Sequence, residues 1–190
     1  MRRLTSAFTF ALLPLFVPGP VAAQEHMHDE EGEHEHMEGH DMAVRSVAPL
    51  FKQVSGYLLA AAEQVPGDLY DYRPTEEVMT FGQILGHVAN AQYAFCGAAT
   101  GEGGSPPENF EERSDKAGIV EGLRTAFAAC EPAYEMEDGR AMEETQVFGR
   151  PAPRLYALTY NVAHNFEHYG NLVTYMRANG LTPPSSQGGM

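Results

Sequence analysis

Stretches of apolar residues at helical spacing, closed by clear start and stop signals, constrain the fold of this chain more than any other feature. Leu50, Val54 and Leu58 share one helix face, and Pro66-Gly67 ends that pattern. Thr80-Phe-Gly-Gln83 has the form of a capping box, in which the Thr and Gln side chains satisfy backbone N–H groups at the start of a helix. The sequence therefore predicts long amphipathic helices with defined ends.

Four such helices are predicted, and no segment alternates convincingly as a strand. They begin at residues 43–49, at 81, after an N-cap at Ser114, and at Pro151 and Pro153, and they end near residues 65, 99, 135 and 180. Four amphipathic helices of this length bury their apolar faces most economically against one another, so an all-α four-helix bundle is predicted for residues 43–184. Residues 185–190 are expected to form a flexible C-terminus.

Residues 1–23 have the pattern of a secretory signal peptide. Arg2-Arg3 form its charged part, residues 7–17 form a short apolar part, and Val21-Ala-Ala23 offers the small residues of a cleavage site, so the mature chain is expected to start near Gln24. The apolar part is shorter than the roughly 20 residues that span a bilayer, so no stable membrane anchor is expected after cleavage. A periplasmic or secreted protein is predicted.

Residues 24–42 consist almost entirely of Glu, His, Met, Asp and Gly, and they contain His26, His28, His34, His36 and His40. This composition cannot build an apolar core, so a disordered tail is predicted. Imidazole, thioether and carboxylate groups together suit Zn, Ni and Cu, which makes the tail a candidate weak, multi-site metal collector. A solvated acidic linker is the alternative interpretation.

The chain is strongly acidic, with 12 Lys and Arg residues, 26 Asp and Glu residues and a net charge of −14. Removal of Arg2 and Arg3 with the signal leaves 10 basic residues against 26 acidic ones, a net charge of −16. Such a surface repels phosphate backbones, so nucleic acid is not an expected partner. The expected partners are a metal ion and a small-molecule substrate of unknown identity, and a homodimer is possible.

The chain has two cysteines, Cys96 and Cys130. In an oxidising compartment a disulfide is the default expectation, and two buried free thiols are the alternative. Each cysteine lies sixteen residues after its predicted helix cap, so parallel second and third helices would bring the two to the same height. Antiparallel helices would separate them by roughly 20 Å, whereas a disulfide needs Cα atoms within about 7 Å. A disulfide would therefore require a crossover bundle.

Three histidines lie outside the tail, and all three fall in predicted helices. His164 and His168 are four residues apart and share one helix face, and His87 shares a face with apolar residues of the second helix. Three imidazoles can hold one metal ion and leave a position open for water or substrate. A hydrogen-bonded core residue is the alternative interpretation of His87 taken alone. Glu111 and Glu112 are interpreted as exposed charge.

The residues around these histidines resemble the DinB-like (DinB/YfiT-like) family of putative metalloenzymes. The matching segments are Tyr72-Arg-Pro74, 80–87, 164–172 and 175–184, which together cover essentially the whole mature domain. The resemblance implies an up-down-down-up bundle with parallel second and third helices. It also implies a site for Zn, Ni or Fe formed by His87, His164 and His168.

Characterised members of the resembled family include thiol S-transferases that use bacillithiol or mycothiol, maleylpyruvate isomerases and metal-dependent hydrolases. The resemblance therefore implies a metal-dependent enzyme, either a hydrolase or a thiol S-transferase-like protein. Low-molecular-weight thiols are cytosolic, so export disfavours the transferase.

The competing prediction is a non-catalytic metal-binding or metal-buffering protein of the cell envelope. The sequence identifies no general base. Asn90, Tyr160, Asn161 and Glu167 lie near the ligands in helix register, where they either orient substrate or fill the bundle.

Overall fold

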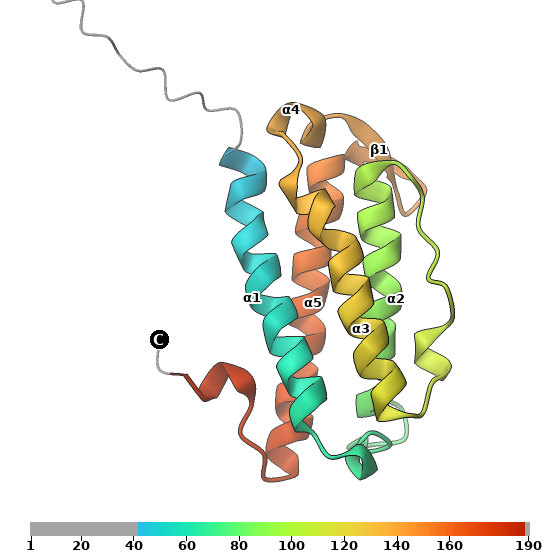
Figure 1. The fold of residues 1–190 in the computed structure, drawn as a ribbon, viewed down its shortest axis with the longest axis vertical. Helices are drawn as coiled ribbons and strands as arrows, with labels where there is room; N and C mark the ends of the chain where they lie inside the picture. The colour runs from blue at the N-terminus through green and yellow to red at the C-terminus, as the bar shows by residue number, and fades with distance from the viewer. Residues whose placement is uncertain (1–41, 189–190) are drawn as a thin grey trace, which may run out of the picture. The chain divides into compact units, whose positions relative to one another are not determined.

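The computed structural model of this chain describes residues 42–188 (Figure 1). The predicted signal peptide (1–23) and the His-rich tail up to residue 41 lie outside the described residues, as do residues 189–190. The predicted flexible C-terminus is described as far as Gly188, and there the backbone N–H of Ser185 donates a hydrogen bond to the Tyr169 hydroxyl. No helix among residues 42–188 is long and apolar enough to cross a membrane.

The described residues are mostly helical. The long helices are α1 (Met42–Gln64), α2 (Phe81–Thr100), α3 (Lys116–Cys130) and α5 (Arg154–Ala178), and α4 (Asp138–Ala141) is a single turn. Short 3₁₀ turns occur at η1 (Gly67–Leu69), η2 (Phe110–Glu112), η3 (Glu131–Glu135) and η4 (Pro184–Ser186). Two strands, β1 (Glu144–Val147) and β2 (Arg150–Pro153), form an antiparallel hairpin.

The helix ends follow local side-chain chemistry. At the start of α2, the Thr80 side chain accepts from the backbone of Gln83 and the Gln83 side chain accepts from the backbone of Thr80, which confirms the capping box. Asp115, rather than the predicted Ser114, caps α3. Helix α1 begins at Met42, before Pro49, because the carboxylate of Asp138 accepts hydrogen bonds from the first N–H groups of that helix.

The prediction that the chain has no strand is wrong. Pro151 and Pro153 lie in β2, and α5 begins only after them, at Arg154. A two-stranded ribbon has no central strand, so proline is tolerated there although it cannot donate to the ladder. Phe148 and Gly149 form the two-residue turn, and both have positive φ angles (53° and 72°), the pattern of a type I′ hairpin.

Helix α2 packs against α3 and α5, and α1 packs against α5 and α3. Figure 1 shows α2 and α3 beginning at the same end of the domain, with the connecting segment returning alongside α2. Cys96 and Cys130 form the expected disulfide between these two helices, with their Cα atoms 5.4 Å apart.

A buried network of polar side chains joins α2, α5 and η3. Gln92 donates to the side-chain oxygen of Asn165 (2.8 Å) and accepts from Asn161 (3.0 Å). Asn161 also donates to the hydroxyl of Tyr134 (3.1 Å). Hydrogen bonds of this kind are costly to break in a buried setting, so the network fixes the register of α5 against α2.

Candidate metal centre

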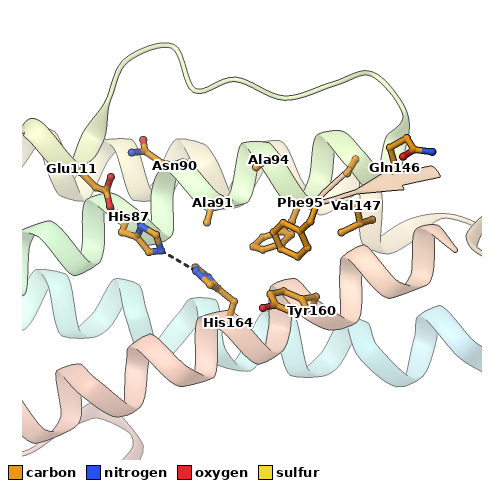
Figure 2. A pocket seen from close by; sticks show the side chains of 12 residues that line it. His87, Asn90, Ala91, Ala94, Phe95, Glu111, Gln146, Val147, Tyr160 and His164 are labelled. Atoms are coloured by element: carbon orange, nitrogen blue, oxygen red, sulfur yellow. Dashed lines mark hydrogen bonds and ion pairs between the residues drawn. The ribbon is translucent and has the colours of Figure 1, made fainter. Parts of the chain in front are cut away.

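The three predicted histidine ligands come together between α2 and α5. The Nε2 atom of His164 lies 3.0 Å from Nε2 of His87 and 3.1 Å from Nε2 of His168. All three candidate ligand atoms lie within 4.8 Å of one another. Figure 2 shows His87 on α2 and His164 on α5 pointing toward each other. The helical register of residues 164 and 168, together with the packing of α5 on α2, is sufficient to build this cluster.

The donor set fits a transition-metal ion. Metal–nitrogen bonds of about 2.0–2.1 Å at a tetrahedral ion place the nitrogens about 3.3 Å apart, close to the separations of His164 from His87 and His168. Three neutral imidazole nitrogens suit Zn, Ni or Fe better than a hard ion such as Mg or Ca. The three histidines could therefore hold one such ion.

Burial keeps two of the rings neutral. Desolvation, followed by the neighbouring His168 and His87, lowers the pKa of His164 to about 4. The pKa of His168 is also lowered, first by burial and then by His87. A neutral imidazole keeps a nitrogen lone pair available, so both side chains are ready to act as ligands near neutral pH.

Glu111 orients the third ring. Its Oε1 atom lies 2.6 Å from Nδ1 of His87, whereas Nδ1 of His164 and of His168 has no hydrogen-bond partner among the described residues. A carboxylate that accepts a hydrogen bond from Nδ1–H keeps the proton on Nδ1 and leaves Nε2 of His87 free to bind a metal ion. The interpretation of Glu111 as exposed charge is therefore wrong: it is half-buried beside the candidate ligands.

A close approach of η2 to α2 brings Glu111 to this position. Phe110 is buried between α2 and α3, where a Cβ at Gly86 would overlap its backbone and a Cβ at Gly122 would overlap its ring. The Asn90 side chain accepts a hydrogen bond from the backbone N–H of Phe110 (3.0 Å). Two glycines and one amide thus fix the short turn that carries the carboxylate.

A pocket of about 530 Å³ opens beside the histidines (Figure 2). Its polar end is formed by His87, His164, Asn90 and Glu111. The rest is formed by small and aromatic residues of α2 and α5 and by the hairpin: Ala91, Ala94, Phe95, Ala98, Gln146, Val147, Phe148 and Tyr160. A pocket of this size fits a small molecule.

The four polar residues that the sequence places near the histidines occupy different environments. Asn90 and Tyr160 line the pocket. Asn161 is fully buried in the polar network and does not line it. Glu167 is exposed, and its charge raises the pKa of His168 against the larger lowering by burial. The hairpin wall was not predicted from sequence, because residues 144–153 were interpreted as a connector and a helix start.

The DinB family model matches residues 25–189. The chain is 27% identical over 124 residues to the uncharacterized protein YjoA of Bacillus subtilis (strain 168), a match that covers 64% of this chain and 80% of that protein.

Solved structures share the fold. A DinB-like protein from Bacillus cereus ATCC 10987 superposes with a TM-score of 0.65 at 18% identity, over 74% of this chain and 95% of that one. The YjoA structure from Bacillus subtilis gives 0.61 at 21% identity, over 76% and 99% of the two chains. The mycothiol-dependent maleylpyruvate isomerase gives 0.56 at 17% identity, over 68% and 60%. The family predicted from sequence is confirmed: the chain belongs to the DinB family.

Proposed function

We propose that this chain is an exported metal-dependent enzyme that binds one divalent ion, Zn, Ni or Fe, through His87, His164 and His168. The observation that carries the proposal is the convergence of three Nε2 atoms, two of them from histidines that line a pocket large enough for a small molecule. A bound ion would supply a Lewis acid and lower the pKa of a bound water toward about 7.

The protein's own residues prepare this site in two ways. Glu111 holds the proton of His87 at Nδ1, which directs the Nε2 lone pair toward the other two rings. Burial holds His164 and His168 in the neutral form. Tyr160 is placed to hydrogen-bond a substrate, because it lines the pocket one helical turn before His164. The Asn90 side chain also lines the pocket, but it is engaged by Asn109 and by the backbone of Phe110.

The pocket favours an enzyme over a metal store. Storage needs ligands but no adjoining space, whereas here the ligands border about 530 Å³ of pocket. Within the enzyme class, a hydrolase is favoured over a thiol S-transferase, since an exported protein would not meet cytosolic thiols. The disulfide supports export because such bonds persist in oxidising compartments.

We also infer that α1, α2, α3 and α5 form a four-helix bundle in the up-down-down-up order. The disulfide supports this order, since Cys96 and Cys130 could not meet if α2 and α3 ran antiparallel. The return of the connecting segment alongside α2 supports it as well (Figure 1).

Metal content tests the ligand assignment. In a full chain whose five tail histidines are replaced by alanine, we expect one zinc per chain by mass spectrometry after dialysis. His164→Ala in the same background should abolish stoichiometric zinc, because two imidazoles alone bind far more weakly. If the tail-substituted chain retains no metal, the proposed function fails.

Turnover separates an enzyme from a store. The metal-loaded chain should hydrolyse members of a panel of neutral esters and amides, and His168→Ala should remove that activity. One tightly held ion with no turnover of ester, amide or thiol substrates would instead support metal buffering in the cell envelope.

A further inference from the structure

Three aromatic rings in mutual contact line the outer part of the pocket. The ring centroids of Phe95, Phe148 and Tyr160 lie 5.0–5.6 Å apart, one ring each from α2, the hairpin and α5. Phe148 is 66% exposed and Tyr160 is 40% exposed, although both are large and apolar in character. Exposed aromatic groups gathered at a pocket mouth are typical of a surface that a ligand covers.

The backbone at Phe148 indicates that its ring is not there to stabilise the fold. Phe148 occupies the first central position of the type I′ turn with φ 53°, where Asn, Asp or Gly is normally found. A bulky side chain in this left-handed region costs free energy. Because most of the ring is exposed, little of that cost is recovered by burial. The ring contacts the rings of Phe95 and Tyr160, which line the pocket.

The pocket has the shape and charge for a flat, neutral group. Ala91, Ala94 and Ala98 lie along the side of α2 that also carries Phe95, and they leave a shallow floor beside the aromatic rings. None of the described residues that line the pocket is Lys or Arg. Its carboxylate, Glu111, is already paired with His87. An anionic group in the outer part of the pocket would therefore lack a positively charged partner.

We propose that the pocket takes a neutral substrate with a planar aromatic group, which packs against the rings of Phe95, Phe148 and Tyr160 and directs its polar end toward His87 and His164. Phe148 is the residue that selects for this group. The direction of the polar end rests on the proposed function, whereas the aromatic contacts do not require a metal.

The test uses 4-fluorobenzamide as a neutral aromatic probe and 4-fluorobenzoate as its anionic counterpart, followed by ¹⁹F NMR with the full chain. In the metal-free protein we expect 4-fluorobenzamide to bind more tightly than 4-fluorobenzoate. Non-fluorinated benzamide should displace it more effectively than cyclohexanecarboxamide, which has the same amide but a puckered ring. Equal or preferred binding of 4-fluorobenzoate, or equal displacement by the puckered ring, would overturn the proposal.

Phe148→Asn tests the selecting residue, with Tyr156→Asn as the matched control. Tyr156 is also an exposed aromatic residue beside Tyr160, but it does not line the pocket. We expect Phe148→Asn to weaken 4-fluorobenzamide binding roughly five- to tenfold and Tyr156→Asn to leave it within about twofold. The thermal midpoint of Phe148→Asn should be equal to or above that of the wild type, since Asn suits the turn. Unchanged affinity, or a loss that follows a fall in thermal midpoint, would contradict the assignment.

The same probes separate this inference from the proposed function. If zinc fails to bind but metal-free protein binds 4-fluorobenzamide through Phe148, the metal-dependent function fails and the aromatic site stands. If zinc binds stoichiometrically but neither form of the protein prefers the neutral aromatic probe, the aromatic site fails and the metal centre stands.

Discussion

Glu111 fixes the ring orientation and the tautomer of His87 in the histidine cluster. Its carboxylate accepts from Nδ1 of His87, and this sets which ring nitrogen faces His164 and His168. Without that acceptor, the imidazole of His87 can rotate or change tautomer, and both changes take the lone pair away from the other ligands.

Glu111→Ala is therefore expected to weaken zinc binding by about 10- to 100-fold, measured by competition with a chromogenic chelator. Glu111→Gln should weaken it less, since its amide oxygen still accepts a hydrogen bond. Glu112→Ala is the control, because the neighbouring Glu112 contacts Asn109 and no histidine. Equal affinities for Glu111→Ala and Glu112→Ala would show that Glu111 does not position His87.

The lowered pKa of His164 makes the metal-free protein sensitive to acid. This pKa is about 4 in the folded protein and about 6.5 in an unfolded chain. Between these values the unfolded chain binds more protons, so the free energy of unfolding falls as the pH drops from about 6.5 toward 4. Urea midpoints measured at intervals from pH 7 to pH 4 should show this fall.

His164→Gln removes the titrating group and serves as the control for the pH experiment. Carboxylates contribute to acid sensitivity in both proteins, so the informative quantity is the difference between them. The variant should lose less stability over this interval than the wild type. The same loss in both would mean that His164 carries no proton linkage to folding.

At the level of single residues, helical spacing predicted the histidine cluster but not the carboxylate beside it. His164 and His168 are local neighbours on a helix, and local geometry can be read from a sequence. Glu111 reaches His87 only because Phe110 packs against Gly86 and Gly122. That contact depends on how two helices and a turn pack, which spacing along one chain does not specify.

At the level of helices, the disulfide is a covalent link between α2 and α3, which pack against each other and are joined along the chain by a long segment. Cys96 and Cys130 are 34 residues apart. Cross-linking a loop of this length removes entropy from the unfolded chain worth about 4 kcal/mol. The double substitution Cys96→Ala and Cys130→Ala should lower the thermal midpoint by roughly 10 °C. Calorimetry with and without reductant checks this.

Zinc binding should survive the loss of the disulfide, because the histidines lie between α2 and α5 rather than between α2 and α3. The double variant should therefore keep one zinc per chain at temperatures where it remains folded. Loss of zinc from a folded double variant would show that α3 holds the site in shape. A midpoint that does not change would contradict a stabilising role for the disulfide.

Helix boundaries were predictable where side chains signal them locally. Thr80 and Gln83 form a capping box that is complete within four residues. The start of α1 depends instead on Asp138, almost a hundred residues away. The hairpin was missed because Pro151 and Pro153 are also common before helices, and because its turn contains Phe148, a residue that rarely occupies this position.

For the whole molecule, the central prediction is that the chain is exported and loses its first residues. Expressed in a bacterium, the protein should be recovered from the periplasmic fraction or the medium. Intact-mass measurement should give an N-terminus near Gln24, and the thiols of Cys96 and Cys130 should be unreactive before reduction. A cytoplasmic protein that still carries residues 1–23 would contradict export.

Two parts of the site lie on different elements: the candidate metal ligands are on the helices, and one wall of the pocket is on the hairpin. The candidate ligands lie on long helices, where a change of register would disturb the core, whereas Val147 and Phe148 lie on a short ribbon joined to α2 by the hydrogen bond from Thr145 to the carbonyl of Ala98. We therefore expect substitutions at the exposed turn residues Phe148 and Gly149 to leave the histidine cluster intact, whereas Val147 is part of the buried core. Exchanges of these turn residues are therefore expected to change which small molecules the pocket accepts while the helical frame stays unchanged.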